Sequence, residues 1–238
     1  MNQQSHSSAS YILQLTLQSR GFTLIEVAIV LVIVALIIGG LLAPLSAQVE
    51  QTRRKATEQG IGSVHEAIIG FALSSGRLPC PDTDGDGLEN PAGGVGGCTN
   101  NSGMLPGATL GIAAADGWGQ AYRYLVAAEF ADNTDGTSSG CGAATPGVSF
   151  ELCAVGDIDV LDAAGGGSVA ASVVAAIVSQ AKNYGATAAA DEAENMDNDR
   201  LLVSHRYTSA AGQEYDDIVS WISPNTLRAK MASAGILP

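Results

Sequence analysis

The chain has 238 residues and a formal net charge of −13, with 24 acidic against 11 basic side chains. This balance argues against a nucleic-acid partner, because Lys and Arg that neutralise phosphates supply the non-specific part of such affinity. The length is enough for one ordinary domain with a hydrophobic core behind an N-terminal segment. We therefore expect one folded domain and no nucleic-acid binding.

An apolar stretch from residue 22 to residue 45 stands out in the N-terminal part of the sequence. As a helix it would extend about 36 Å, against roughly 30 Å for the hydrocarbon core of a bilayer. A cleaved secretory signal is the weaker interpretation, because Leu41 and Leu45 occupy the minus-three positions before the small residues Ala43 and Ala47. We therefore predict a transmembrane helix over residues 22–45.

One carboxylate, Glu26, interrupts this stretch. A charged acid near the bilayer centre costs on the order of 2.5 kcal/mol or more, so such a residue indicates a function. The alternative is a first-turn acid that is favoured by the helix dipole and stays at the interface. A cut after Gly21, which has no side chain to hinder a protease, would place the new amine of Phe22 one helical turn before Glu26. The same amine on a neighbouring copy could then pair with the carboxylate in a low dielectric.

The sequence Gly21-Phe22-Thr23-Leu24-Ile25-Glu26 closely resembles the prepilin motif of type IV pilins and of type II secretion pseudopilins. The resemblance implies that prepilin peptidase removes residues 1–21, that Phe22 becomes the N-methylated first residue, and that Glu26 pairs with the terminal amine of a neighbouring subunit. It also implies a single-pass inner-membrane protein with a periplasmic domain, which is extracellular if assembled into a pilus. The cluster Arg53-Arg54-Lys55 departs from this orientation, since the positive-inside rule would place it in the cytoplasm.

The rest of the chain is predicted to continue this helix and then to form a globular domain. Apolar positions at helical spacing predict an amphipathic second half over residues 46–75, ended by Gly76 and Pro79. Within the domain, residues 76–238, strands are predicted at 122–127, 148–155, 201–207 and 218–222, and helices at 168–182 and 223–235. This order indicates an α+β fold with antiparallel strands, and the resemblance implies the pilin-like arrangement of a long helix packed on a sheet.

Four cysteines follow the apolar stretch: Cys80, Cys98, Cys141 and Cys153. In an oxidising compartment they would form disulfides with three alternative connectivities. We favour Cys80 with Cys98 and Cys141 with Cys153, because each pair would close a polar, glycine-rich loop and stabilise it by roughly 3 kcal/mol. A zinc site is disfavoured, since no C-x-x-C or paired Cys/His spacing occurs.

Alternating carboxylates between the first two cysteines form the front half of a D-x-D-x-D-G calcium loop. The expected ligands are Asp82, Asp84, Asp86 and Asn90. The EF-hand glutamate is missing, because Gly93 occupies its position, so Glu89, Asn90 or a distant acid would have to complete the shell. An Asx-rich turn in solvent is an equally weighted alternative. Some members of the resembled pseudopilins use calcium to fix a loop, which favours the calcium interpretation slightly.

Two further segments bear on the fold and on catalysis. Residues 116–124 resemble the D-x-W-G-x-x-Y-x-Y element of pseudopilins, in which we expect Trp118 to plug the core with Tyr122 and Tyr124 on one strand face. A second acidic run, residues 191–199, is expected to be a solvated loop. No nucleophile elbow or clustered catalytic pair is visible, so we do not expect an enzyme.

Two functions therefore compete. The first is a structural subunit, a minor pilin or pseudopilin of a type IV pilus or type II secretion pseudopilus, with other subunits, prepilin peptidase and the inner membrane as partners. The second is a filament-displayed binding module that acts as an adhesin or captures a secreted protein. Glu26 favours incorporation along the filament, since in the resembled family the tip subunit tends to lack this acid.

Overall fold

The computed structural model describes residues 21–92, 96–132, 140–142, 144–185 and 189–238, except for the side chains of residues 40–44. The chain divides into two compact units, one ending at Gln48 and the other running from Val49 to Pro238. Apart from Gly21, the predicted leader over residues 1–21 lies outside the described residues.

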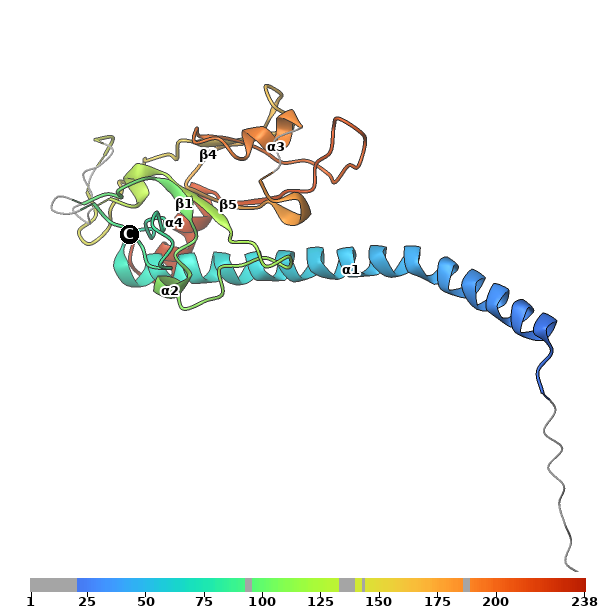
Figure 1. The fold of residues 1–238 in the computed structure, drawn as a ribbon. Helices are drawn as coiled ribbons and strands as arrows, with labels where there is room; N and C mark the ends of the chain where they lie inside the picture. Colours follow the sequence, from blue (N-terminus) through green and yellow to red (C-terminus); the bar gives the residue numbers. More distant parts are fainter. Residues whose placement is uncertain (1–20, 93–95, 133–139, 143, 186–188) are drawn as a thin grey trace, which may run out of the picture. The chain divides into compact units, whose positions relative to one another are not determined.

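One long helix, α1, runs from Leu24 to Ser75 and confirms the predicted length and end (Figure 1). The Thr23 hydroxyl accepts a hydrogen bond from the Glu26 N–H at 3.3 Å and caps the first turn. At the other end Gly76 takes a φ of +73°, and its N–H donates to the Ala72 carbonyl at 2.9 Å. Both termini of α1 are therefore set by local sequence signals.

The N-terminal part of α1 is exposed within the described residues of its own unit. The described side chains of residues 21–39 are all exposed. Within the described residues, no helix combines the length and the apolar character that crossing a membrane requires. The span predicted over residues 22–45 includes residues 40–44, whose side chains are outside the described set.

The second unit contains two sheets. The four-stranded sheet has the order β1-β2-β5-β7 and is antiparallel throughout; its strands are Ser102–Met104, Arg123–Val126, Ala175–Ser179 and Ile218–Ile222. The three-stranded sheet has the order β4-β3-β6, with strands Ser168–Val173, Ile158–Leu161 and Leu201–Val203. The predicted antiparallel pairing is wrong at one place, since β3 and β6 are parallel. Short helices complete the unit: α2 (Gly107–Leu110), η1 (Ala128–Phe130), η2 (Ala181–Asn183), α3 (Ala190–Glu194) and α4 (Pro224–Ser233).

Side chains of the four-stranded sheet alternate between two hydrophobic cores. Tyr124 and Ile177 pack in one core with α1 residues such as Ile68, whereas Leu125 and Val178 pack in the other with residues of β3, β4 and β6. This alternation follows from the period of two in a strand. The result is a layer of helix, a four-stranded sheet and a second sheet, with β4 and α3 beyond β1 and β5 as seen from α1 (Figure 1).

The helix predicted over residues 168–182 is wrong, because these residues form β4 and β5. All five side chains of β5 are buried, since this strand lies between two sheet neighbours and both of its faces are covered. A short apolar run of this kind has no amphipathic period and cannot be told from a buried helix by pattern alone. Ser168, expected as a helix N-cap, instead begins β4.

The strand predicted over residues 148–155 is also wrong. Phe150 is fully buried against Phe130, with ring centroids 4.4 Å apart, yet the segment is irregular. The buried Glu151 carboxylate accepts hydrogen bonds from the N–H groups of Cys141 and Gly142, so a side chain takes the place of a strand ladder.

Other predicted elements are confirmed in the structure. β2 and β7 lie where strands were expected, and the strand expected at 201–207 is shortened to β6. α4 starts at Pro224 behind the Ser223 cap, whose hydroxyl accepts from the Thr226 N–H at 3.1 Å. Both predicted disulfides are present, Cys80–Cys98 and Cys141–Cys153.

Candidate functional site

The peptide bond between Gly21 and Phe22 is accessible. A Cβ placed on Gly21 would meet nothing within 4 Å, and Phe22 is 80% exposed. Glu26 is exposed in the first turn of α1, where the helix dipole favours a carboxylate. The backbone is therefore accessible at Gly21, and an acid lies one turn after Phe22.

Thr23 caps the first turn of α1, a role that was not predicted from the sequence. Its hydroxyl caps the Glu26 N–H, so Thr23-Leu24-Ile25-Glu26 has the T-x-x-E pattern of a capping box. This pattern was visible in the sequence and could have predicted where the helix begins. It fixes the start of α1 at Leu24, three residues after Gly21, and leaves Phe22 outside the helix.

The cluster Arg53-Arg54-Lys55 is partly engaged by the second unit. The Arg54 guanidinium donates to the Asp216 carbonyl at 3.2 Å and lies 5.2 Å from the centroid of the Tyr207 ring. Arg53 and Lys55 are exposed. At least one of the three cations therefore has a structural role, which weakens the cluster as an orientation signal.

The D-x-W-G element docks on α1 through its backbone. The Gly117 N–H donates at 2.9 Å to the hydroxyl of Thr57, a buried threonine that itself donates to the Arg53 carbonyl at 3.0 Å. A Cβ on Gly117 would lie 2.3 Å from the Arg53 carbonyl oxygen, so only glycine permits this approach. Thr57 was not predicted; a small polar residue on the apolar face of the helix is its only sequence signal.

Asp116 organises the turn that carries Trp118. One carboxylate oxygen accepts from the N–H groups of Trp118 and Gln120, both at 2.9 Å, and the other accepts from the buried Ser179 hydroxyl at 2.6 Å. The prediction that Trp118 plugs the core is wrong, since its side chain is only half-buried. The side chain belongs to neither hydrophobic core, although its indole Nε1 is buried.

The two tyrosines of this element, rather than Trp118, fill the core beside α1. Tyr122 and Tyr124 are 1% and 0% exposed. The Tyr122 hydroxyl donates to the Thr57 carbonyl at 3.4 Å, and that of Tyr124 donates to the Pro79 carbonyl at 3.2 Å. Burial, with a smaller effect of Asp116, raises the pKa of Tyr122 to about 12. Both hydroxyls therefore stay neutral donors; that of Tyr122 binds α1, and that of Tyr124 binds the segment that follows α1.

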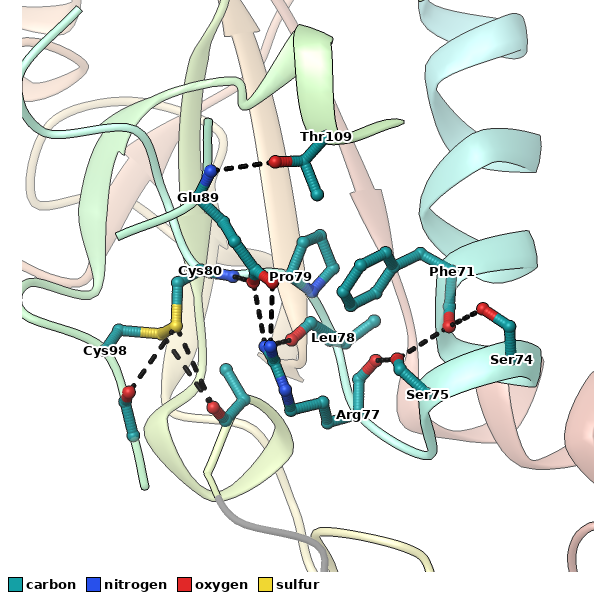
Figure 2. A network of polar contacts seen from close by, with 12 residues as sticks. Phe71, Ser74, Ser75, Arg77, Leu78, Pro79, Cys80, Glu89, Cys98 and Thr109 are labelled. Atoms are coloured by element: carbon teal, nitrogen blue, oxygen red, sulfur yellow. Dashed lines mark hydrogen bonds and ion pairs between the residues drawn. A yellow bond between two sulfur atoms is a disulfide. The ribbon is translucent and has the colours of Figure 1, made fainter. Parts of the chain in front are cut away.

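Glu89 is held away from the predicted calcium loop. Its carboxylate accepts two hydrogen bonds from the Arg77 guanidinium, at 2.9 and 2.8 Å, and one from the Cys80 N–H at 3.0 Å. Figure 2 shows this pair beside the Cys80–Cys98 disulfide, with the Glu89 N–H bonded to the Thr109 hydroxyl. Glu89 thus ties the end of α1 to the disulfide loop and has no part in a metal shell there.

The loop itself brings the three aspartates together. Carboxylate oxygens of Asp82, Asp84 and Asp86 lie within 4.8 Å of one another. Asp82 is buried and accepts from the N–H groups of Asp84, Gly85 and Gly87 at 3.1, 2.7 and 2.8 Å. Burial alone would raise the pKa of Asp82, but these backbone donors lower it below its usual value.

Asn90, the fourth expected ligand, is used within the loop. Its side-chain oxygen accepts from the N–H of Thr83 at 2.6 Å and from the Thr83 hydroxyl at 3.0 Å. Asp84 and Asp86 remain exposed. The loop therefore has the Asx-turn bonding of the alternative interpretation and also the carboxylate spacing of the calcium interpretation.

The second acidic run, expected to be a solvated loop, contains part of a buried cluster. Glu192 lies in α3 and is 2% exposed, close to Asp216 at 7% and Asp217 at 4%. Carboxylate oxygens of these three residues lie within 4.8 Å of one another. Nothing in the composition of the run distinguishes Glu192 from its exposed neighbours.

Comparison with known families identifies the N-terminal segment. The family model described as the prokaryotic N-terminal methylation motif matches residues 17–42. No curated protein and no solved structure matches the chain. The matched segment contains Gly21, Phe22 and Glu26 and is the signature of prepilin-type substrates. The chain therefore carries the N-terminal signature of type IV pilin and pseudopilin precursors.

Proposed function

We propose that prepilin peptidase cuts this chain after Gly21, that the new N terminus at Phe22 is methylated, and that the subunit assembles through α1 into a filament. The observation that carries the proposal is the matched motif at the start of a helix whose described side chains over residues 21–39 are all exposed. Apolar surface of this extent is unfavourable in water, at about 25 cal/mol per Å². Neighbouring helices in a filament would cover it.

Before assembly, we propose, this part of α1 lies in the inner membrane and the second unit lies in the periplasm. Two disulfides in the second unit support an oxidising compartment. The contacts of Arg54 with Asp216 and Tyr207 are compatible with this orientation. Because they give Arg54 a structural role, Arg54 is weaker evidence that the positive-inside rule would place this part of the chain in the cytoplasm.

Within the filament, Glu26 is proposed to pair with the N-terminal amine of an adjacent subunit. The pairing would offset the cost of placing a lone carboxylate among apolar helices. We favour a subunit incorporated along the filament, in a pilus or a secretion pseudopilus, over a filament-displayed binding module. Assembly rather than catalysis is the proposed role.

Glu26→Gln tests this proposal directly. The variant should be cut and methylated at Phe22 as usual, while its recovery in purified filaments falls at least roughly tenfold, because the charge pair is lost. Mass spectrometry of the N-terminal peptide measures processing, and quantitative immunoblots of sheared filaments measure incorporation. Glu58→Gln, at an exposed acid further along α1, is the matched control and should behave as the wild type.

Two outcomes would contradict the proposal. A wild-type chain that still begins at Met1 in cells with active prepilin peptidase would remove the processing step. Equal incorporation of the Glu26→Gln variant would remove the assembly role of the carboxylate. Cross-linked partners in the same filaments would separate a pilus subunit from a secretion pseudopilin.

Calcium binding by Asp82, Asp84, Asp86 and Asn90 stays a prediction. Calcium should raise the melting temperature of the full chain in detergent by roughly 5–10 °C at a hundredfold excess over its dissociation constant. The Asp84→Ala variant should lose this shift, because an exposed carboxylate of the cluster is removed. Glu214→Ala, at an exposed acid outside the loop, should keep it. An unchanged wild-type melting temperature at millimolar calcium would leave only the Asx turn.

A further inference from the structure

Among the described residues, no ion pair joins a cation to the buried carboxylates of Glu192, Asp216 and Asp217. Glu192 accepts from the Asn183 side-chain amide at 2.9 and 2.8 Å and from the Asp216 N–H at 3.0 Å. Asp217 accepts from the Asn195 amide at 2.8 Å. The neighbouring cation, Arg54, donates to the Asp216 backbone carbonyl rather than to a carboxylate in the bonds observed. Neutral donors thus surround three carboxylates whose oxygens lie within 4.8 Å of one another.

One carboxylate oxygen of Asp216 lacks a hydrogen-bond partner among the described residues. This atom, Oδ1, is buried. A buried ionised oxygen without a partner is costly, whereas a protonated carboxyl has a donor that can reach a nearby carboxylate. Like charges at this separation also repel, so one proton shared in the cluster removes both penalties.

A histidine also binds α3, through Asp191. His205 Nδ1 lies 2.8 Å from the Arg206 carbonyl oxygen, and Nε2 lies 3.0 Å from an Asp191 carboxylate oxygen. Both ring nitrogens therefore face oxygen atoms. The ring also stacks on Tyr215, with centroids 3.8 Å apart, and the His205–Asp191 pair lines a cavity of about 420 Å³.

Hydrogen bonds connect the acid cluster and the region of His205 through α3 and through Asn195, which follows this helix. Asn195 donates to Asp217 at 2.8 Å and accepts from the Val203 N–H at 2.8 Å. The Tyr215 hydroxyl donates to the Val203 carbonyl at 2.7 Å. Asp191 and Glu192, adjacent in α3, thus bind His205 on one side and the Asp216 backbone on the other.

We propose that α3 and residues 204–217 form a pH-operated clamp, which is closed while the buried acid cluster carries protons and loosens as these protons leave. The clamp acts on α3, because loss of these protons places negative charge on Asp216 and Asp217 beside the buried Glu192 of this helix. The clamp also contacts α1, because the Asp216 carbonyl accepts a hydrogen bond from Arg54 of that helix. Mildly acidic surroundings therefore stabilise this side of the unit.

The direction of the titration supports the clamp. Burial first and the Glu192 charge second raise the pKa of Asp216 to about 6, with Glu50 adding to the rise and Arg54 and the Lys182 backbone opposing it. Burial raises the pKa of Asp217 to about 7; the Asn195 bond opposes this, while Glu192 and Asp216 add to it. Since both values exceed those of an unfolded chain, stability is greatest below about pH 4 for these groups and is lost as the pH rises through 6 and 7.

The test uses the full chain in detergent with EDTA, melted between pH 5 and pH 8. The wild-type melting temperature should fall by about 4 °C or more across this range, and Asp217→Asn should at least halve the fall. Glu214→Gln, an exposed acid close in sequence, is the matched control and should keep the wild-type slope. Asp216→Asn is a second variant with the same expectation, should Asp217→Asn fail to fold.

Hydrogen exchange gives a local measurement that a global change would not reproduce. After correction for the intrinsic pH dependence, amides of residues 189–217 should exchange at least roughly tenfold faster at pH 8 than at pH 5, while those of β2 and β5 should not. A wild-type slope in Asp217→Asn would overturn the proposal. So would stabilisation by calcium that survives in Asp84→Ala but is lost in Asp217→Asn, since the cluster would then hold a cation instead of a proton.

Discussion

Replacing Gly76 with alanine is expected to lower the free energy of unfolding by roughly 3 kcal/mol or more. Gly76 ends α1 with a φ of +73°, and a Cβ there would lie 1.7 Å from the Gly147 carbonyl oxygen. The Gly76 carbonyl also accepts the Ser149 N–H at 3.0 Å, so the segment cannot move away without losing a hydrogen bond. Thermal melting should show a decrease of about 6 °C or more.

Gly235 provides the matched control for this change. It follows α4 with the same φ of +73°, but a Cβ there would meet nothing within 4 Å. Gly235→Ala therefore carries only the cost of a left-handed alanine, about 1–2 kcal/mol. Equal losses in the two variants would show that the contact with Gly147 contributes nothing.

Asp116→Ala is expected to cost about 3–5 kcal/mol of stability, because it removes the acceptor for three donors at once. The N–H groups of Trp118 and Gln120 and the Ser179 hydroxyl would be left without their charged partner. The turn they form holds Gly117 against α1, so its loss also loosens the docking of the helix. Chemical denaturation of the full chain measures the change.

Ser179→Ala separates the parts of this effect. It removes a single donor to Asp116 and should cost about 1 kcal/mol. Asp116→Asn keeps one oxygen acceptor and should fall between the two alanine variants. If Asp116→Ala costs no more than Ser179→Ala, the backbone bonds of the turn do not contribute to stability.

Elements with local signals were predictable from the sequence. The end of α1 at Gly76, the Ser223 cap of α4 and the alternation in β2 depend on residues only a few positions apart. The disulfide pairing was also local, since each bond closes a short loop. Gly21, Phe22 and Glu26 belong to this class, because a linear motif defines them.

Elements set by distant partners were not predictable. β5 is a central strand because β2 and β7 flank it, and its continuous apolar sequence gave no period to indicate a strand. Segment 148–155 had the composition of a strand but has a buried glutamate in place of a neighbouring strand. Likewise, only the fold shows that Glu192 is buried beside Asp216.

The disulfides also determine how the chain can be oxidised in the oxidising compartment proposed above. Their partners are separated by 18 and 12 residues, and the two loops neither overlap nor enclose one another. A chain that emerges from its N terminus presents Cys80 and Cys98 before Cys141 appears. Each thiol therefore meets its own partner first, and simple oxidation in order of emergence gives the native pairing without a reshuffling step.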